Sequence, residues 1–325
     1  MIGKIFIEGD YLEIYPYMNW LFLLNHEGDL LVSRTEQLID DSVLHDYFFR
    51  QGKNIVSPPP RETVVSIDPR KFKKIAKIAD QYSFSDLRFF YSNILCGSND
   101  GLQFLAFDTA TETITKEMKV TDTPISSIAA RYMTVFAASL EDSVTTLFGV
   151  KAGEYAHIRK TGSQASRVGV SFKRIHFYAG AVDLHVSTYE RSPVEADVGD
   201  EKDREEINRI DEARPYAFGQ EVPDFVFNSN NGIYLKFGAE LRYRKDDSLE
   251  PFIFPLGNSG KLISAHLHMG ATTFEFLDGL FCRIKNSWMP LLEGECISTR
   301  GYSNSVNYQK TVTAVNERGA HYFVL

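Results

Sequence analysis

The chain has 325 residues, 43% of them hydrophobic, which is enough to bury a large core. It carries 35 basic against 43 acidic residues, and a net charge of −8 argues against a general nucleic-acid-binding protein, which needs a positive surface. The longest apolar runs fall short of the roughly 18 residues that a membrane-spanning helix requires.

The cysteines and the N-terminal residues indicate the compartment. Cys96, Cys282 and Cys296 are too few and too irregularly spaced for a disulfide framework or a zinc site, so we expect buried free thiols. The first residues lack the charged and apolar regions of a signal peptide. Together these features predict a protein of the cytoplasm or of another reducing compartment.

The first strands can be identified from apolar runs near the N-terminus. Residues 4–7 form a strand that has no neighbour of its own, and residues 11–15 alternate like the inner strand of a sheet. The runs 20–24 and 30–33 flank the turn 27–29, which predicts a β-hairpin.

The strand pattern is interrupted after this hairpin. Apolar residues within 36–49 recur with helical spacing, and Gly52 is a plausible end for the helix. The three prolines at 58–60 then force an extended segment, and residues 63–67 read as a strand.

The basic run 70–77 has two interpretations. It is either a short amphipathic helix or an outer strand whose lysines protect an exposed sheet edge. The sequence leaves open which part of residues 55–80 is the outer strand of the first sheet.

Seven hairpin tips define a repeat. Most neighbouring tips lie about 40 residues apart, which with four strands per unit is the spacing of propeller blades. Two longer intervals each hold one blade and an insertion. The tips are at residues 27–29, 99–101, 141–142, 180–183, 238–240, 278–279 and 317–319.

The two ends of the chain complete one blade between them. The last unit has room for three strands, at 297–304, 309–315 and 320–325, and the strand at 4–7 supplies the fourth. This pairing removes a sheet edge and ties down both ends. We therefore predict an all-β fold, a single β-propeller domain over 1–325, with seven blades as the best count and six or eight as alternatives.

Over essentially the whole chain, this spacing resembles the WD40-type seven-bladed β-propeller. The resemblance is limited to the fold, because the Gly-His pair at blade starts and the Trp-Asp pair at strand ends are absent. Leu21 and Met289 follow the two tryptophans, Trp20 and Trp288. The resemblance implies a platform for protein–protein interaction, since most such propellers bind partners rather than catalyse.

Two insertions, at about 36–62 and 192–214, follow the third strand of their blades. If the blades are equivalent, both insertions lie on one face of the propeller. Long loops on a rigid scaffold often form binding sites. Neutral growth of loops is the alternative. Because the second insertion is highly charged, we expect an exposed loop, or a marginal helix over 202–209.

We assign partner binding to the two insertions and to the basic run. A further hypothesis is association with nucleic acid through residues 70–77. The residues assigned to partner binding are Asp46, Tyr47, Phe48, Phe49, Arg70, Lys71, Lys73, Lys74, Glu201, Arg204 and Glu205.

No phosphate-binding loop, nucleophile elbow or metalloprotease motif is present, so we assign no catalytic residue, cofactor or metal. His266 and His268 alternate on the expected innermost strand of blade six and could form an acid–base or metal site. The other candidates for that site are His157, His176 and His185. Candidates to line a polar channel are Asp224, Arg131, Arg300 and Tyr302.

The leading hypothesis is a non-catalytic scaffold, a subunit of a soluble, cytoplasmic multiprotein complex. As an isolated chain it would be a monomer that binds other proteins, with no membrane and no nucleic acid as direct ligand. The alternative is a propeller enzyme, a hydrolase or lyase, that uses His266 or His268 in the central channel.

Overall fold

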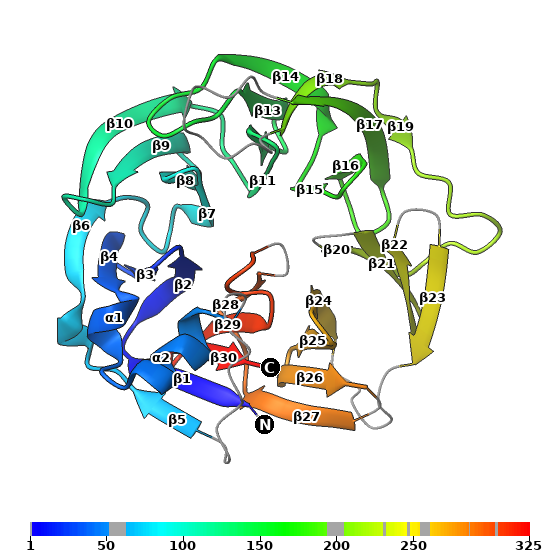
Figure 1. Cartoon of the computed structure of the whole chain (residues 1–325). Coiled ribbons are helices and arrows are strands. Elements are labelled where there is room, and N and C mark those ends of the chain that lie inside the picture. Colours follow the sequence, from blue (N-terminus) through cyan, green and yellow to red (C-terminus); the bar gives the residue numbers. More distant parts are fainter. Residues whose placement is uncertain are drawn as a thin grey trace. The chain divides into compact units, whose positions relative to one another are not determined.

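The structure is a computed structural model that describes residues 2–51, 63–193, 205–229, 232–245, 248–253, 261–285, 287–302 and 305–325. Strands within these residues form seven sheets, which we number as blades one to seven in chain order (Figure 1). The all-β class and the count of seven blades are therefore confirmed.

The chain divides into two compact units. The first unit comprises Met1–Gln81 and Phe254–Leu325 and contains blades one, six and seven. The second comprises Tyr82–Ile253 and contains blades two to five.

In every blade the neighbouring strands are antiparallel and follow one another in chain order, apart from the two strands from the N-terminal part of the chain that complete blade seven. In the first unit, blade one contains β2 (Tyr11–Tyr17), β3 (Trp20–Asn25), β4 (Asp29–Arg34) and β6 (Lys73–Lys77). Blade six contains β24 (Leu262–His268), β25 (Ala271–Phe276), β26 (Gly279–Ile284) and β27 (Ser287–Glu293). Blade seven contains β28 (Ser298–Gly301), β29 (Thr311–Asn316), β30 (Gly319–Val324), β1 (Gly3–Glu8) and β5 (Thr63–Ser66).

The second unit contains four blades of the same design. Blade two contains β7 (Phe84–Phe90), β8 (Asn93–Ser98), β9 (Gly101–Asp108) and β10 (Thr113–Thr121). Blade three contains β11 (Ser127–Arg131), β12 (Thr134–Ala138), β13 (Ser143–Phe148) and β14 (His157–Gln164). Blade four contains β15 (Arg167–Val170), β16 (Arg174–Tyr178), β17 (Leu184–Pro193), β18 (Glu205–Ile210) and the short β19 (Arg214–Pro215). Blade five contains β20 (Phe225–Ser229), β21 (Gly232–Phe237), β22 (Glu240–Lys245) and β23 (Ser248–Ile253).

All seven predicted hairpin tips connect the second and third strands of a blade. Gly279 and Gly319 occupy equivalent positions at two of these tips, with φ of +153° and +145°. A Cβ atom there would collide with the carbonyl oxygen of Leu292 on β27 or of Ile7 on β1, the fourth strand of each blade. The repeat therefore keeps glycine where only glycine fits.

Apolar side chains of neighbouring sheets pack face to face to form the core. Phe136 and Val144 of blade three pack in one cluster with Ile175 and Phe177 of blade four, and all four side chains are almost fully buried. Similar clusters join blades two and three, four and five, and six and seven. The three cysteines are free and buried, as predicted.

Blade seven combines strands from both ends of the sequence. β1 pairs antiparallel with β30 from Gly3↔Val324 to Glu8↔Gly319, which confirms the predicted closing strand. β5 then adds to β1 in parallel as a fifth strand, which the sequence did not predict. The outer strand of blade one, left open by the sequence, is β6, which pairs with β4.

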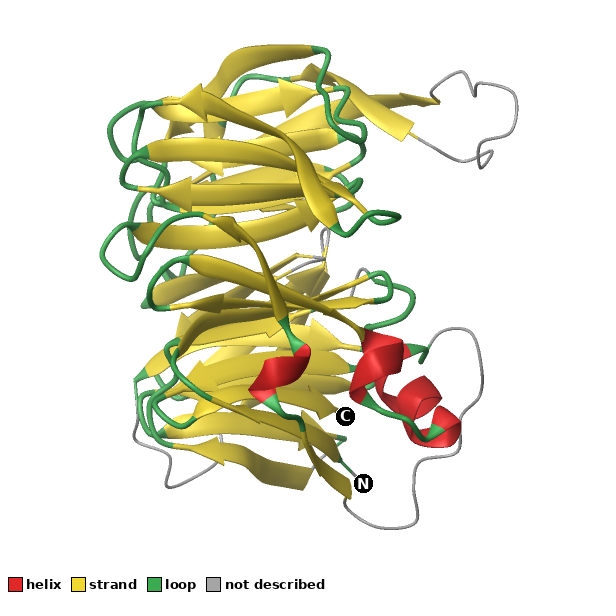
Figure 2. Ribbon diagram, turned by 90° about the vertical axis from the view of Figure 1, so that its left-hand side faces the viewer, coloured by secondary structure: helices red, strands yellow, loops and turns green. Residues whose placement is uncertain are grey.

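The first insertion contains two helices rather than one continuous helix (Figure 2). α1 (Thr35–Leu38) ends before Ile39, and α2 (Ser42–Phe49) starts after Asp41, whose carboxylate accepts hydrogen bonds from two backbone N–H groups. This N-cap explains the break in the helical pattern. Gly52, the predicted end, lies outside the described residues. Neither helix is long enough to cross a membrane.

The second insertion is smaller than predicted. β17 continues to Pro193, and β18 returns beside it over Glu205–Ile210, so the expected loop or marginal helix is wrong for residues 205–210. Ile207 is 2% exposed and packs into the core between blades three and four, which explains why this charged segment forms a strand.

Candidate functional site

A cluster of arginines and aromatic rings lies where blades three and four meet in the second unit. We call it the arginine–aromatic surface and define it as Arg131, Tyr132, Phe172, Tyr189 and Arg191. These residues come from the end of β11, from the turns β11–β12 and β15–β16, and from the outer half of β17.

The two turns present their aromatic residues for local reasons. Tyr132 and Met133 both have positive φ, 49° and 51°, which matches the twist of a two-residue hairpin. Ser171 and Arg174 close the other turn through their backbone groups and the Ser171 hydroxyl. Phe172 is thereby held at the tip, where 46% of its surface is exposed.

The guanidinium groups of Arg131 and Arg191 each lie over the rings of Tyr132 and Phe172. The Arg191 Cζ atom is 4.7 Å from the ring centre of Tyr132 and 4.6 Å from that of Phe172. The corresponding distances for Arg131 are 4.9 and 5.7 Å. Each contact of this type contributes about 0.5–1 kcal/mol at an exposed site, so the four contacts hold these side chains in a defined arrangement.

The β17–β18 hairpin is anchored on this surface. The N–H of Ile207 donates to the carbonyl oxygen of Tyr132 at 3.3 Å, and Arg191 forms an ion pair of 2.6 Å with Glu205. The hydroxyl of Tyr189 donates to the carbonyl oxygen of Ser171 at 2.7 Å. Burial, with the neighbouring Tyr132 adding to it, raises the pKa of Tyr189, so this hydroxyl stays protonated and remains a donor.

The predicted partner-binding residues of α2 are arranged differently from the expectation. Tyr47, Phe48 and Phe49 are 6%, 0% and 1% exposed and pack inward, with the Phe49 ring 5.4 Å from that of Tyr322 on β30. They hold α2 on blade seven and offer no surface to a partner, which corrects the assignment for these three residues. Asp46 stays partly exposed beside Arg50, at 3.7 Å.

The basic run has partners within the first unit. Lys71 donates to the carbonyl oxygens of Gln37 and Leu38, and Lys74 forms an ion pair of 2.5 Å with Asp29 across β6 and β4. Arg70 pairs with Asp68 at 2.6 Å and lowers the pKa of that carboxyl to about 2.

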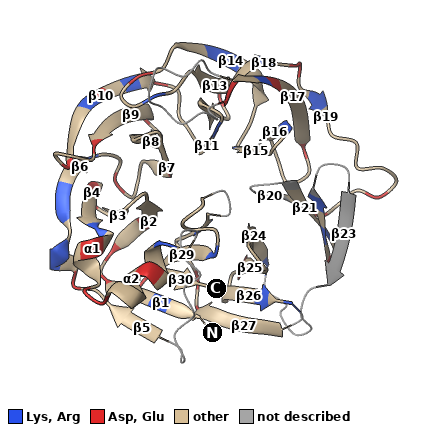
Figure 3. Cartoon of the chain, viewed as in Figure 1, with Lys and Arg blue, Asp and Glu red and all other residues tan. Residues whose placement is uncertain are grey.

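The position of the lysines agrees with the edge-protection interpretation. Lys73 is exposed on β6, an outermost strand. Figure 3 shows lysine and arginine on the outermost strands β10 and β14 as well. Lysines on an edge strand hinder pairing with another chain.

The remaining assigned residues belong to the second insertion. Glu205 is the partner of Arg191 and therefore borders the arginine–aromatic surface. Glu201 and Arg204 lie outside the described residues. The two insertions belong to different units, so a shared face stays a prediction.

His266 and His268 have separate environments on β24. His268 is 4% exposed, its Nε2 is 2.9 Å from the Thr273 hydroxyl, and burial lowers its pKa to about 3, so it is neutral at physiological pH. His266 is partly exposed and is 3.1 Å from the hydroxyl of Thr299 on β28. A side chain at Gly301 would collide with both histidines, so β24 and β28 must pack closely here.

A polar junction connects blades six and seven around His266. We define it as Ser264, His266, Glu275 and Thr299. The two hydroxyls donate to the same carboxylate oxygen of Glu275, at 2.6 and 2.5 Å. One hydroxyl comes from β24 of blade six and the other from β28 of blade seven, so this carboxylate links the two blades.

The other predicted histidines belong to blades three and four of the second unit. His157 lies on the outer strand β14, stacked 4.7 Å from the ring of Phe148, while His176 and His185 lie on β16 and β17. Across the described part of the chain, no three His, Cys, Asp or Glu side chains form a group that could hold a metal.

The candidate channel residues belong to both units, and each has partners within its own unit. Arg300 forms a buried ion pair of 2.7 Å with Glu13 of blade one, and the Tyr302 hydroxyl donates to the carbonyl oxygen of Ile14 at 3.2 Å. Asp224 accepts the N–H of Gly238 at 2.6 Å and stabilises a turn of blade five. Arg131 belongs to the arginine–aromatic surface.

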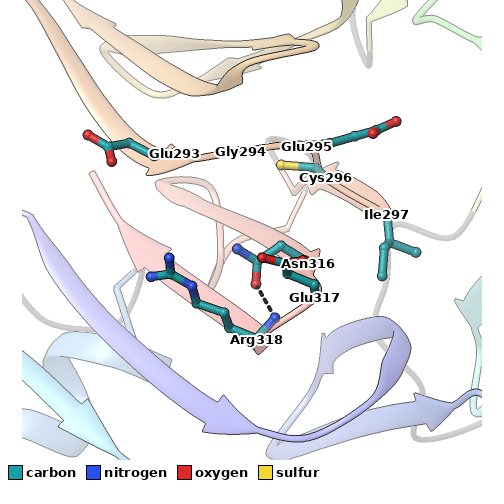
Figure 4. A pocket seen from close by; sticks show the side chains of 8 residues that line it. All are labelled: Glu293, Gly294, Glu295, Cys296, Ile297, Asn316, Glu317 and Arg318. Carbon is teal, nitrogen blue, oxygen red and sulfur yellow. Dashed lines mark hydrogen bonds between the residues drawn. The ribbon is translucent and has the colours of Figure 1, made fainter.

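A pocket of about 440 Å³ lies between the end of β27 and the β29–β30 tip (Figure 4). Its lining includes three carboxylates, from Glu293, Glu295 and Glu317, together with the guanidinium of Arg318. Cys296 also lines it. Burial, together with the nearby carboxylates of Glu275 and Glu295, raises the pKa of its thiol to about 12, so the thiol is a poor nucleophile at neutral pH.

Sequence reasoning missed four of the five residues of the arginine–aromatic surface and assigned Arg131 to a channel. One local signal was present. Phe172 is an aromatic residue next to Lys173 in a turn, where polar residues are usual. The grouping itself could not be predicted, because the three contributing segments are distant in sequence.

No family model and no curated protein matches the sequence. Solved structures do match in fold. The WD40 domain of Neurospora crassa Pan2 aligns with 97% of this chain and 89% of its own, with a TM-score of 0.52 and 9% identity. The WD40 β-propeller domain of Doa1 aligns with 97% and 92%, with a TM-score of 0.54 and 8% identity. The computationally designed Ika8 protein aligns with 99% of each chain, with a TM-score of 0.56 and 8% identity.

These likenesses establish the fold. The chain is a WD40-like, seven-bladed β-propeller in which the N-terminal strand closes the last blade. Propellers of this type commonly serve as platforms for protein interaction. At 8–9% identity, the partners of the similar proteins are not carried over.

Proposed function

We propose that this protein is a non-catalytic protein-binding propeller and that the arginine–aromatic surface is its main contact with a partner. The observation that carries the proposal is the group of two arginines, two tyrosines and the half-exposed Phe172. Arginine and tyrosine are enriched among the residues that dominate binding energy at protein interfaces. An exposed aromatic held at a rigid turn loses little entropy when a partner covers it.

The cellular setting is part of the same proposal. The chain acts as one propeller domain and as a subunit of a soluble, cytoplasmic multiprotein assembly. Three buried free cysteines support a reducing compartment.

Substitution of Phe172 tests the function. Phe172→Ala removes the exposed ring and leaves the backbone of the turn intact. The expected loss at an interface anchor is about 2 kcal/mol, or about 30-fold in Kd. Tagged wild-type and variant proteins would first be used to capture partners from cells, and the identified partner would then be titrated in purified form.

The matched control is Leu140→Ala. Leu140 is 60% exposed and lies in blade three at the opposite end of β12 from Tyr132, so its removal changes a similar exposed area. We expect Leu140→Ala to bind like the wild type. Equal affinity of the wild type, Phe172→Ala and Leu140→Ala for the purified partner would rule out this surface as the contact.

A further inference from the structure

The arginine–aromatic surface carries more positive than negative charge in a chain that is acidic as a whole. The phenol of Tyr189 at its centre lies in the field of two guanidiniums, Arg131 and Arg191, and of one carboxylate, Glu205. Lys173, next to Phe172 at the turn, is exposed and forms no ion pair within the described residues. Among the described residues, two guanidiniums and one carboxylate thus act on this phenol, and Lys173 adds an exposed cation at the turn, on a molecule whose net charge is −8.

The geometry favours carboxylates as the groups that this surface recognises. A guanidinium is a planar fork of donors that matches a carboxylate, and rings beneath it fix its orientation before binding. Phe172 beside the cations provides an apolar contact for the rest of the partner. The surface thus combines an apolar anchor with a positive border.

We propose, resting on the proposed function, that the partner segment bound here is an acidic stretch of protein with an apolar residue beside its carboxylates. Nucleic acid fits less well for a physical reason. Binding to a phosphate backbone needs several cations along an extended track, and the whole chain would repel a polyanion. Arg131, Arg191 and Lys173 are few enough to match a few carboxylates of a peptide.

A direct test uses two labelled 12-residue peptides in fluorescence anisotropy. Both contain one leucine, and the flanking four residues are glutamates in one peptide and glutamines in the other. We expect the glutamate peptide to bind at least about tenfold more tightly at low salt and to lose this advantage as salt rises to 0.5 M, because salt screens exposed charges. Equal binding of the two peptides, or no binding of either, would overturn the proposal.

Charge reversal at the turn gives the second arm of the test. Lys173→Glu should lower the affinity for the glutamate peptide about three- to tenfold, because it replaces an attraction by a repulsion at the border of the contact. Lys116→Glu is the control with the same change in net charge, because Lys116 lies on the outer strand of blade two. It should change the affinity by less than about twofold.

The outcomes separate this inference from the proposed function. If Phe172→Ala abolishes binding of the purified partner but Lys173→Glu and salt leave it unchanged, the surface binds protein and the acidic segment is wrong. If a labelled 20-nucleotide single strand binds more tightly than the glutamate peptide and depends on Lys173, the recognised ligand is a nucleic acid and the inference is overturned.

Discussion

Glu275 is a buried carboxylate that contributes an unusual pH dependence. It is 6% exposed, and burial raises its pKa, while the hydrogen bonds from Ser264 and Thr299 act in the opposite direction. A raised pKa means that the folded state favours the protonated carboxyl. The stability that this group contributes is therefore complete below its unfolded pKa and is lost as the pH rises through the raised folded value.

Glu275→Gln tests this coupling. The amide oxygen can still accept the two hydroxyls, and no charge is buried at any pH. We expect equal stability of variant and wild type near pH 4, and a variant that is more stable by on the order of 1 kcal/mol at pH 8. Urea unfolding at pH 4, 6 and 8 measures the difference.

Glu293→Gln is the matched control at the residue scale. Glu293 is an exposed carboxylate at the end of β27, in the same region of the first unit. Its substitution should leave the free energy of unfolding unchanged at every pH. A Glu275→Gln variant that is less stable than the wild type at pH 8 would show that the two hydroxyl donors outweigh burial.

At the scale of elements, the hairpins could be predicted from the sequence and the β17–β18 extension could not. A tip such as Asp278-Gly279 depends on local turn chemistry, which a few residues specify. The strand character of β18 depends on Ile207, whose contact with Tyr132 lies about 75 residues away in sequence. The arginine–aromatic surface was missed for the same reason, because its chemistry arises only where distant turns meet.

Ile207 is expected to hold the β17–β18 extension of blade four against blade three. Ile207→Ala removes buried methyl groups at a peripheral strand, where the loss is about 2–4 kcal/mol of local stability. We expect the amide protons of β18 to exchange faster by at least tenfold, while those of β12 keep their protection. Hydrogen exchange followed by mass spectrometry resolves the two segments.

The control for the extension is Asn208→Ala, an exposed neighbour on the same strand. It should leave exchange in β18 unchanged. If Ile207→Ala accelerates exchange in β12 as much as in β18, the extension and blade three unfold as one unit and the separate anchoring is wrong.

At the scale of the whole molecule, the fold depends on β1, an N-terminal strand that completes a sheet of C-terminal strands. Ile5 of β1 is fully buried between Tyr322 of β30 and Val65 of β5 in the pairing register. The sequence predicted this closure because the last unit lacked a fourth strand and the first strand lacked a neighbour. It predicted a strand at 63–67 but not its parallel pairing with β1, because the four residues of β5 carry no signal for a parallel partner.

If β1 closes blade seven, substitutions on β1 and on the neighbouring β5 should differ in their cost to the free energy of unfolding. Ile5→Ala should reduce the free energy of unfolding by about 2–4 kcal/mol, because the cavity lies in the sheet that joins the two ends of the chain. Val64→Ala, on the adjacent β5, removes a side chain that is 59% exposed and should cost less than about 0.5 kcal/mol. Urea unfolding of both variants measures the costs. If the two costs were equal, β1 would be an accessory edge strand, and blade seven would hold together on β28, β29 and β30 alone.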